Sequence, residues 1–275
     1  MDTQPSSDWL RRYLDLLGVE FQDPDWELLA QLTRAHTLRI AFENVTSILR
    51  RQANPNGAVP GLDFDVILDS WVDGRAGGVC FEITPMFERL LRGLGYRVHT
   101  AMADSSFPDS HQALVVQFGN ARYLVDVGNS APLFEPVPLI GEVEVFHAGL
   151  GYRFRADAPE ADIWRLDRLI DGTWAPFMRY HLRPATDAAR EAAYQRHHTP
   201  GQSWVVDSLR IMHCDQHQVG LIRDERFTRF TADGKHVEQI QNRAAYVRIV
   251  ADVLGMPTLP VGAAVDALSR RNSCS

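Results

Sequence analysis

Cys80 has the surroundings of a residue that does covalent chemistry. It lies in the run AGGVCFEI (residues 76–83), two residues after the pair Gly77–Gly78 and at the start of an apolar stretch typical of a helix. A thiol attacks as its thiolate, which the unpaired N–H groups and the dipole of a helix N-terminus stabilise, and the same N–H groups can hold an oxyanion. A small buried cysteine beside a glycine turn would give the same pattern, so both interpretations stay open at this point.

His111 and Asp126 are the residues best placed to serve such a nucleophile. His111 precedes the strand-like run QALVVQF and Asp126 closes the run RYLVD, with Gly119-Asn120 as a tight turn between them. Counting outward from a two-residue turn places Asp126 opposite Ala113 and one diagonal step from His111, on the same face. The pattern therefore allows a base and a carboxylate that orients it. An exposed strand histidine and a turn-capping aspartate are the alternative.

Composition bounds the class of protein. The chain has 275 residues, 45% of them hydrophobic and 23% charged, with a formal net charge of -7, which is typical of a globular protein and argues against a nucleic-acid or anionic-membrane partner. Three cysteines are too few for a disulfide framework or a four-ligand zinc site. No stretch is long and apolar enough to span a membrane and the N-terminus does not resemble a signal peptide, so we expect a cytoplasmic protein.

Helical periodicity dominates the first third of the sequence, and we expect residues 1–98 to form a helical bundle that carries the nucleophile. The expected helices are one capped by Ser7 and ending before Gly18, one capped by Asp23 with Pro24 at its first position, one that begins near Ile40, one over residues 62–71, and one from Val79 to Gly95.

The periodicity then changes to alternation, which predicts an antiparallel β-barrel over residues 99–200 and an α/β lid over residues 201–275. The expected strands are 96–103, 112–118, 122–127, 152–157, 163–170, 173–179, 203–212, 219–224 and 227–240, with hairpin turns at Asp171-Gly172 and Asp233-Gly234. A short helix is expected over 186–197 and a closing amphipathic helix over 242–256. The fold class is therefore α+β.

A second cluster of polar residues suggests a metal. His213, Asp215 and His217 would project from one face if residues 212–218 formed a strand. Alternate residues of one strand rarely converge on one ion, so we expect an exposed polar strand face and no metal.

Four blocks of the sequence resemble the arylamine N-acetyltransferase family. They are HTLRIAFENVTSI (residues 36–48), AGGVCFEI (76–83), SHQALVV (110–116) and RYLVDVGNSAP (122–132). These blocks are similar to the family's His-x5-Phe-Glu-Asn block, its Arg-Gly-Gly-x-Cys-aromatic-Glu block, its histidine before an apolar strand and its Asp-Val-Gly segment. Their order and spacing agree with the family over about residues 8–140.

The resemblance implies a thiol acyltransferase. Family members take an acyl group from acetyl-CoA onto the cysteine and pass it to an arylamine or arylhydrazine nitrogen in a ping-pong cycle. Carried over, Cys80 is the nucleophile, His111 the base and Asp126 the orienting carboxylate. The implied fold is a helical bundle, a β-barrel and an α/β lid around a cysteine-protease-like catalytic core. Acetyl-CoA is then a co-substrate, and no bound cofactor is implied.

The resemblance also implies substrate contacts. Phe42, Val79, Gly128 and Asn129 are the expected lining of the substrate pocket. The loop that contains His198, Thr199 and Gly201 corresponds in position to the family's approach to the lid, and with Arg196 and His197 it forms a local cationic stretch suited to CoA phosphates. Cys214 and Cys274 have no activating neighbours and are expected to be inert.

Two departures from the family pattern bear on the substrate. Ala76 stands where the family has an arginine, and Asn129-Ser130 replaces a Phe-Gly pair. Losing the aromatic ring is expected to make the pocket more open and more polar. The altered segment keeps open an amide synthase of the same family that is fed by an acyl carrier protein. Two further alternatives are a cysteine-triad hydrolase, since papain-like peptidases use a similar trio of side chains, and a non-catalytic relative, which the intact triad positions disfavour.

Overall fold

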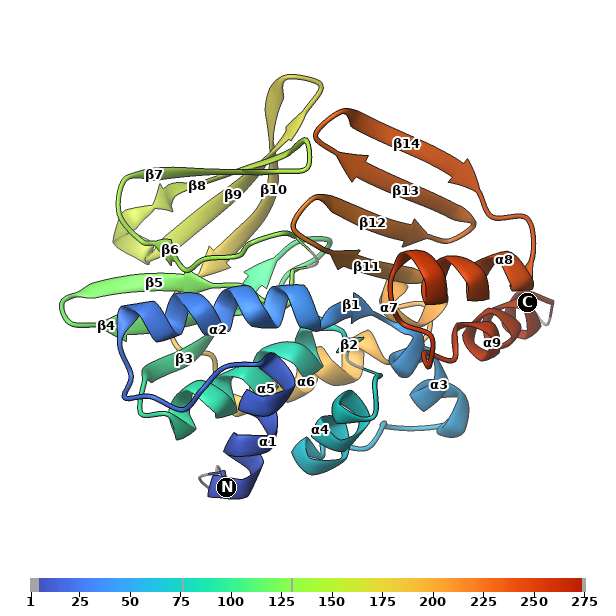
Figure 1. The fold of residues 1–275 in the computed structure, drawn as a ribbon, viewed down its shortest axis with the longest axis horizontal. Coiled ribbons are helices and arrows are strands. Elements are labelled where there is room, and N and C mark those ends of the chain that lie inside the picture. The colour runs from blue at the N-terminus through green and yellow to red at the C-terminus, as the bar shows by residue number, and fades with distance from the viewer. Residues whose placement is uncertain (1–4, 76, 130, 274–275) are drawn as a thin grey trace.

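Two β-sheets and a set of N-terminal helices make up the structure, a computed structural model that describes residues 5–75, 77–129 and 131–273. The structure has an eight-stranded and a six-stranded sheet. The first lies at the upper left of Figure 1 and the second at the upper right, with the N-terminal helices below them. This mixture of helices and antiparallel strands confirms the predicted α+β class. Within the described residues, no helix combines the length and apolar character needed to cross a membrane.

The N-terminal helices pack around a core of large side chains. Helix α5, which begins with Cys80, has eleven buried residues, and five of them, Ile83, Met86, Phe87, Leu90 and Leu91, belong to this core. Tyr13, Trp71 and Phe87 are each no more than 1% exposed in this core. The helices are α1 (Ser7–Leu17), α2 (Trp26–Arg39), α3 (Val45–Ala53), α4 (Phe64–Val72) and α5 (Cys80–Gly93).

Three of the predicted helix starts in this region were wrong. Ser6 rather than Ser7 caps α1, because its Oγ accepts the Trp9 N–H at 3.1 Å. Asp25 rather than Asp23 caps α2, where its carboxylate accepts the Leu28 N–H at 2.7 Å. In both cases two similar polar residues precede the helix, and the start of a helix is uncertain by one or two residues when it is predicted from sequence. The third error is the helix expected near Ile40, where the chain instead forms strand β1 (Ala41–Glu43) before α3.

The eight-stranded antiparallel sheet curls into a nearly closed barrel. Its strand order is β6-β5-β4-β3-β10-β9-β8-β7. The predicted hairpin at Gly119-Asn120 is confirmed, with Phe118 paired to Ala121 and Leu114 to Val125. The strands are β3 (Arg97–Asp104), β4 (His111–Phe118), β5 (Ala121–Val125), β6 (Val137–Pro138), β7 (Glu142–His147), β8 (Leu150–Ala158), β9 (Ile163–Ile170) and β10 (Thr173–His181), and the short helix η1 (Pro159–Ala161) joins β8 to β9.

The six-stranded sheet joins distant parts of the chain, in the order β14-β13-β12-β11-β1-β2. Strand β1 pairs with β2 (Gly77–Gly78) on one side and with β11 on the other. The expected bundle (1–98) and lid (201–275) therefore share one sheet, and the division into three domains stays a proposal. The remaining strands are β11 (Arg210–Cys214), β12 (Gln218–Arg223), β13 (Arg226–Thr231) and β14 (Gly234–Gln239).

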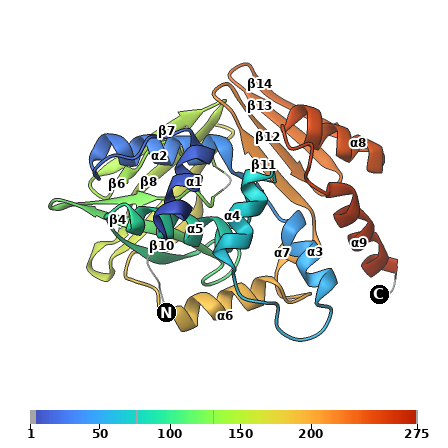
Figure 2. The same cartoon turned by 60° about the horizontal axis from the view of Figure 1, so that its bottom comes forward.

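The helices of the C-terminal third differ from the prediction in two places. The strand expected over 203–212 begins as helix α7 (Trp204–Asp207), since the Ser203 side chain caps it. The expected closing helix is divided into α8 (Arg243–Arg248) and a π-helical turn (Ile249–Val253), and a further helix, α9 (Val261–Ser273), follows. Helix α6 (Asp187–His197), which was predicted, runs along the lower edge of Figure 2.

Candidate active site

Cys80 is the first residue of α5, directly after the N-cap residue Val79. Its side chain is nearly buried, with 6% of the residue exposed. The Glu82 carboxylate accepts the Val79 N–H at 3.0 Å, and the Cys80 carbonyl accepts the side-chain amide of Gln112 at 3.1 Å. The nucleophile candidate is therefore held at a helix N-terminus, where the dipole favours negative charge.

His111 and Asp126 meet as the hairpin register predicts. The His111 Nε2 atom lies 2.9 Å from both carboxylate oxygens of Asp126, and both residues are buried. The Tyr180 hydroxyl, from β10, donates to the same carboxylate at 2.7 Å. Asn129 in turn donates to the Tyr180 oxygen at 3.4 Å. Tyr180 was not predicted as a site residue, because nothing in the sequence around it indicates a contact with Asp126, 54 positions earlier.

The His111 ring is cationic in this setting. Burial on its own would lower the pKa of His111, but Asp126 and the Cys80 side chain outweigh burial and raise this pKa to about 10. A hydrogen bond from the imidazolium to each neighbour contributes to the same shift. The ring therefore interacts with the thiol group on one side and the carboxylate on the other, which is the arrangement of a nucleophile, a base and an orienting acid.

Buried charges lie beneath the start of α5. The Glu82 carboxylate, 2% exposed, forms an ion pair with Arg50 of α3. Glu43 is fully buried and accepts the Thr46 N–H at 3.0 Å. Burial, followed by the nearby Glu82, raises the pKa of Glu43 to about 7, against hydrogen bonds from Thr46 that lower it. Gly77 allows this packing, since a Cβ there would lie 2.6 Å from the Glu43 Cγ.

The expected substrate-pocket residues lie close to Cys80. Val79 precedes it in the chain, and Gly128 packs directly against it. Phe42 is 9% exposed and Asn129 is 6% exposed. Phe42 borders a cavity of about 20 Å³, the size of one water molecule, whose other lining residues are Thr37, Ile40, Val127, Ala131, Met212, His213 and Cys214. Ala76 and Ser130, the other departures from the family pattern, lie outside the described residues.

The expected CoA loop is less cationic than its sequence indicates. His197 and His198 are both buried, and burial lowers the pKa of each ring, to about 3 for His197. These rings are therefore neutral, and His198 is not open to a ligand. Thr199 is half-buried and donates its hydroxyl to a backbone carbonyl, whereas Gly201 is exposed with φ +77. Thr199 and Gly201 stay candidates for contact with CoA.

His213 lies within β11, whereas Asp215 and His217 lie in the turn after it, so the expected single strand face over residues 212–218 was wrong. The two ring nitrogens of His213 lie 2.8 Å and 3.0 Å from the Leu254 and Leu38 carbonyl oxygens. Asp215 accepts the His217 N–H at 2.7 Å. In the part of the chain that the structure describes, no three metal-ligating side chains gather at one point.

The structure describes one of the two other cysteines, Cys214. Cys214 is buried, and burial is the main cause that raises its pKa to about 12. It therefore stays protonated at neutral pH. Cys274, also expected to be inert, lies outside the described residues.

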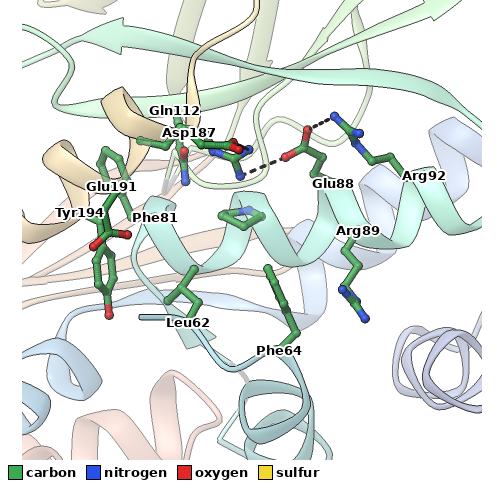
Figure 3. A pocket seen from close by; sticks show the side chains of 12 residues that line it. Leu62, Phe64, Phe81, Glu88, Arg89, Arg92, Gln112, Asp187, Glu191 and Tyr194 are labelled. Carbon is green, nitrogen blue, oxygen red and sulfur yellow. Dashed lines mark hydrogen bonds and ion pairs between the residues drawn. The ribbon is translucent and has the colours of Figure 1, made fainter. Parts of the chain in front are cut away.

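A larger cavity of about 400 Å³ lies beside α5, between this helix and α6 (Figure 3). Phe81 and Gln112, which follow Cys80 and His111 in the chain, contribute to its wall. Because side chains alternate along β4, Gln112 and His111 point to opposite faces of the strand. Glu88 in the wall pairs with two arginines at 2.9 Å and 3.1 Å. This cavity therefore lies on the opposite side of β4 from the His111 ring.

Comparison with known proteins gives a family match and close structural neighbours. Residues 25–257 match the N-acetyltransferase family. The chain is 30% identical over 141 residues to an arylamine N-acetyltransferase / N-hydroxyarylamine O-acetyltransferase of Salmonella typhimurium, covering 48% of this chain and 46% of that protein. It is 31% identical over 139 residues to the proansamycin X synthase of Amycolatopsis mediterranei, covering 48% and 51%. These matches span about half the length of each relative.

Solved structures extend the similarity to nearly the whole chain. The arylamine N-acetyltransferase of Mycobacterium abscessus superimposes with a TM-score of 0.82 at 21% identity, covering 97% of this chain and 98% of that one. The Mycobacterium marinum enzyme in complex with CoA superimposes with a TM-score of 0.79 at 24% identity, covering 95% and 97%. At this level of identity, the structural similarity establishes the fold.

Proposed function

The chain belongs to the arylamine N-acetyltransferase family, and we propose that it moves an acetyl or other short acyl group from acyl-CoA to an arylamine or hydrazine nitrogen through a thioester on Cys80. The observation that supports this most directly is the His111 ring, which is hydrogen-bonded to Asp126 at 2.9 Å and interacts electrostatically with the Cys80 side chain. The other supports are the match to N-acetyltransferases and the CoA complex of a structural neighbour.

The first half-reaction forms the acyl-enzyme. The Cys80 thiolate attacks the thioester carbonyl, and backbone N–H groups in the first turn of α5 bind the oxyanion that develops. The bond between carbonyl carbon and CoA sulfur then breaks. The His111 imidazolium gives its proton to the departing CoA thiolate, so that free CoA leaves as a thiol. Asp126, itself held by Tyr180, keeps the ring oriented.

The second half-reaction transfers the acyl group. The amine nitrogen attacks the Cys80 thioester, and neutral His111 accepts the proton that the nitrogen loses. The carbon–sulfur bond breaks, which releases the amide and restores the thiolate beside the imidazolium. Burial of Cys80 and His111, 6% and 5% exposed, favours this route because it limits hydrolysis of the acyl-enzyme by water.

Intact mass spectrometry tests the acyl-enzyme step. Incubation with acetyl-CoA alone is expected to add one acetyl group to the wild-type protein and none to Cys80→Ala. Addition of an arylamine is expected to remove the group as the amide. The absence of an adduct from any thioester would contradict the proposal, and rapid loss of the adduct without an amine would favour a hydrolase instead.

Alkylation tests the role of His111. Iodoacetamide is expected to modify Cys80 much more slowly near pH 7 in His111→Ala than in the wild type, because the thiolate loses its cationic partner. An unchanged alkylation rate would contradict the assignment of His111 as that partner. Replacing the exposed His236 of β14 by Ala is the matched control and is expected to leave the rate unchanged.

An amide synthase is the second candidate function. Asn129 occupies the position where the family has an aromatic residue, and it contacts the Tyr180 hydroxyl that holds Asp126. One relative at 31% identity is named as a synthase, proansamycin X synthase. If this function applies, an acyl group presented on a carrier protein is expected to load Cys80 faster than acetyl-CoA does. Equal or slower loading from the carrier would exclude it.

A further inference from the structure

Three arginines lie side by side on neighbouring strands of the six-stranded sheet. Arg210 of β11 is directly opposite Arg223 of β12, which is directly opposite Arg226 of β13. Directly opposed residues of antiparallel strands share one face of a sheet, and like charges at such positions destabilise it. The chain as a whole carries a net charge of -7. This arginine row is therefore a local concentration of positive charge in an acidic protein.

Among the residues that the structure describes, the arginine row has no direct acidic partner. Within residues 5–75, 77–129 and 131–273, no ion pair or hydrogen bond joins any of the three guanidinium groups to an acid. The acids of the adjoining turn are engaged elsewhere: Asp224 accepts the Leu209 N–H at 3.1 Å, and Glu225 accepts the Gln239 side-chain amide at 3.2 Å.

Arg210 is the most enclosed member of the row. Its Nε–H is buried and has no acceptor among the described residues. Burial, followed by the charge of Arg223, lowers the pKa of Arg210 to about 10, against a smaller opposite effect of Asp224. Both effects mean that keeping this side chain charged costs free energy in the ligand-free protein. A bound anion would reduce that cost.

The row adjoins the candidate active site. The Arg210 guanidinium lies 3.8 Å above the centre of the Trp204 ring, and that ring lies 6.1 Å from the ring of Phe42. Phe42 is opposite Met212 of β11 on one side and Gly78 on the other. Because neighbouring strands are about 4.8 Å apart, the backbone at Arg210 lies on the order of 10 Å from the segment that carries Cys80.

We propose that the arginine row binds the phosphate groups at the end of the acyl donor's pantetheine arm. This assignment rests on the proposed function, since it concerns the donor that loads Cys80. The arm would run from the thioester past Phe42 and Trp204, and the phosphates would lie against the guanidinium groups. Thr199 and Gly201, the candidate CoA contacts, belong to the loop that leads into Trp204. The row and the loop therefore border the same approach.

The chemistry of arginine favours a phosphate over other anions. Guanidinium groups present paired N–H donors that match phosphate oxygens, and adjacent arginines suit a group with more than one negative charge. Two donors carry such a group at this place: CoA, with its pyrophosphate, and a carrier protein, whose pantetheine arm ends in a phosphodiester. The arginine row would bind the phosphate that both donors carry at the end of the pantetheine arm.

Steady-state kinetics with donors of increasing length test the assignment. For Arg210→Gln, the KM for acetyl-CoA is expected to rise about tenfold, the effect of losing one charge-assisted hydrogen bond, with kcat nearly unchanged. Acetyl-pantetheine, which lacks phosphate, is expected to react equally well with the variant and the wild type. Arg223→Gln in addition is expected to raise the KM for acetyl-CoA further.

Further donors distinguish the two sources of phosphate. An equal loss with acetyl-phosphopantetheine and acetyl-CoA means that the row binds the phosphate that CoA shares with a carrier. A loss confined to acetyl-CoA means that it binds the nucleotide end. Either result supports binding of donor phosphate by the row. Arg229→Gln is the control, because Arg229 lies on β13 but points to the opposite face, over Phe227.

Two results would overturn the assignment while leaving the proposed function intact. One is an unchanged KM for acetyl-CoA in the Arg210→Gln, Arg223→Gln double variant. The other is an equal loss with acetyl-CoA and acetyl-pantetheine, which would indicate a structural role. Failure of the proposed function itself is distinguishable, because the wild-type protein would then accept an acyl group from none of the thioesters.

Discussion

Gly128 lies against the backbone of Cys80 with no room for a side chain between them. A Cβ at Gly128 would be 3.0 Å from both the Cα and the Cβ of Cys80 and 2.8 Å from the Thr84 Oγ1. Gly128 is also only two residues after Asp126. The segment that carries the orienting carboxylate therefore touches the first turn of α5, and this contact sets the position of the thiol group relative to the carboxylate.

Gly128→Ala is expected to reduce acyl transfer more than it reduces stability. The added methyl group must displace Cys80, whereas overpacking of this kind costs about 1–3 kcal/mol in the free energy of unfolding. We expect alkylation of Cys80 and the rate of acyl-enzyme formation to fall at least about tenfold, since small displacements of reacting groups lower rates by such factors.

Gly61→Ala is the matched control for this variant. Gly61 is exposed, its φ is not positive, and a Cβ there would meet nothing within 4 Å. The rate of acyl transfer and the denaturation midpoint of Gly61→Ala are expected to match those of the wild type. Wild-type labelling rates in Gly128→Ala would show that the contact does not position the thiol.

Tyr180→Phe tests the hydrogen bond that supports Asp126. The phenol donates to this carboxylate at 2.7 Å, so its removal leaves the acid with fewer donors in a buried site. A hydrogen bond to a charged group contributes about 1.5–3 kcal/mol, and we expect kcat/KM for acetyl-CoA to fall about tenfold. Tyr152→Phe is the control: Tyr152 is 4% exposed, and among the described residues its hydroxyl has no hydrogen-bond partner. Equal effects of the two variants would contradict a specific role for Tyr180.

The meeting of His111 and Asp126 could be predicted from the sequence because it is a local geometric result. A two-residue turn fixes every later pair of a hairpin, and the observed pairing of Leu114 with Val125 places Asp126 beside the start of β4. The N-terminus of α5 was predictable for a similar reason, because a glycine pair precedes a long apolar periodic stretch.

Other parts of the site depend on contacts that no local pattern encodes. Strand β1 has three residues, all buried, and it exists because Phe42 pairs with Met212, which is 170 positions later. The ion pair between Arg50 and Glu82 joins α3 to α5. The histidines of the expected CoA loop were interpreted as cationic because sequence does not show burial, and burial is what makes His197 neutral.

Glu43 is expected to make the stability of the protein depend on pH. Its pKa rises from 4.5 to about 7 because of burial, and Glu82 adds to that rise. Between these two pH values the folded protein retains a proton that the unfolded chain has released, so the free energy of unfolding falls as the pH rises through this window. Urea denaturation is expected to show that the free energy of unfolding of the wild type falls relative to that of Glu43→Gln as the pH rises from 4.5 to 7.

A surface acid provides the comparison for Glu43. Glu142 of β7 is exposed, and Glu142→Gln is expected to leave the pH dependence of the wild type unchanged. If the curves for the wild type and Glu43→Gln ran parallel from pH 4.5 to pH 7, the titration of Glu43 in this window would be contradicted. Measuring differences between variants removes the contribution of the histidines, which all of the proteins share.

Arg50→Met is expected to destabilise the protein strongly, because it leaves the Glu82 carboxylate buried without its cation. Glu82 is 2% exposed, and breaking a buried ion pair from one side costs about 3–5 kcal/mol. Adding Glu82→Gln to this variant removes the uncompensated charge and is expected to restore most of the loss.

Arg11→Met is the matched control. It breaks an ion pair in which both side chains are more than 60% exposed, and it is expected to cost less than about 1 kcal/mol. Guanidinium denaturation measures all three variants. If Arg50→Met cost no more than Arg11→Met, or if Glu82→Gln recovered nothing, Arg50 would not be the compensating charge beneath Cys80.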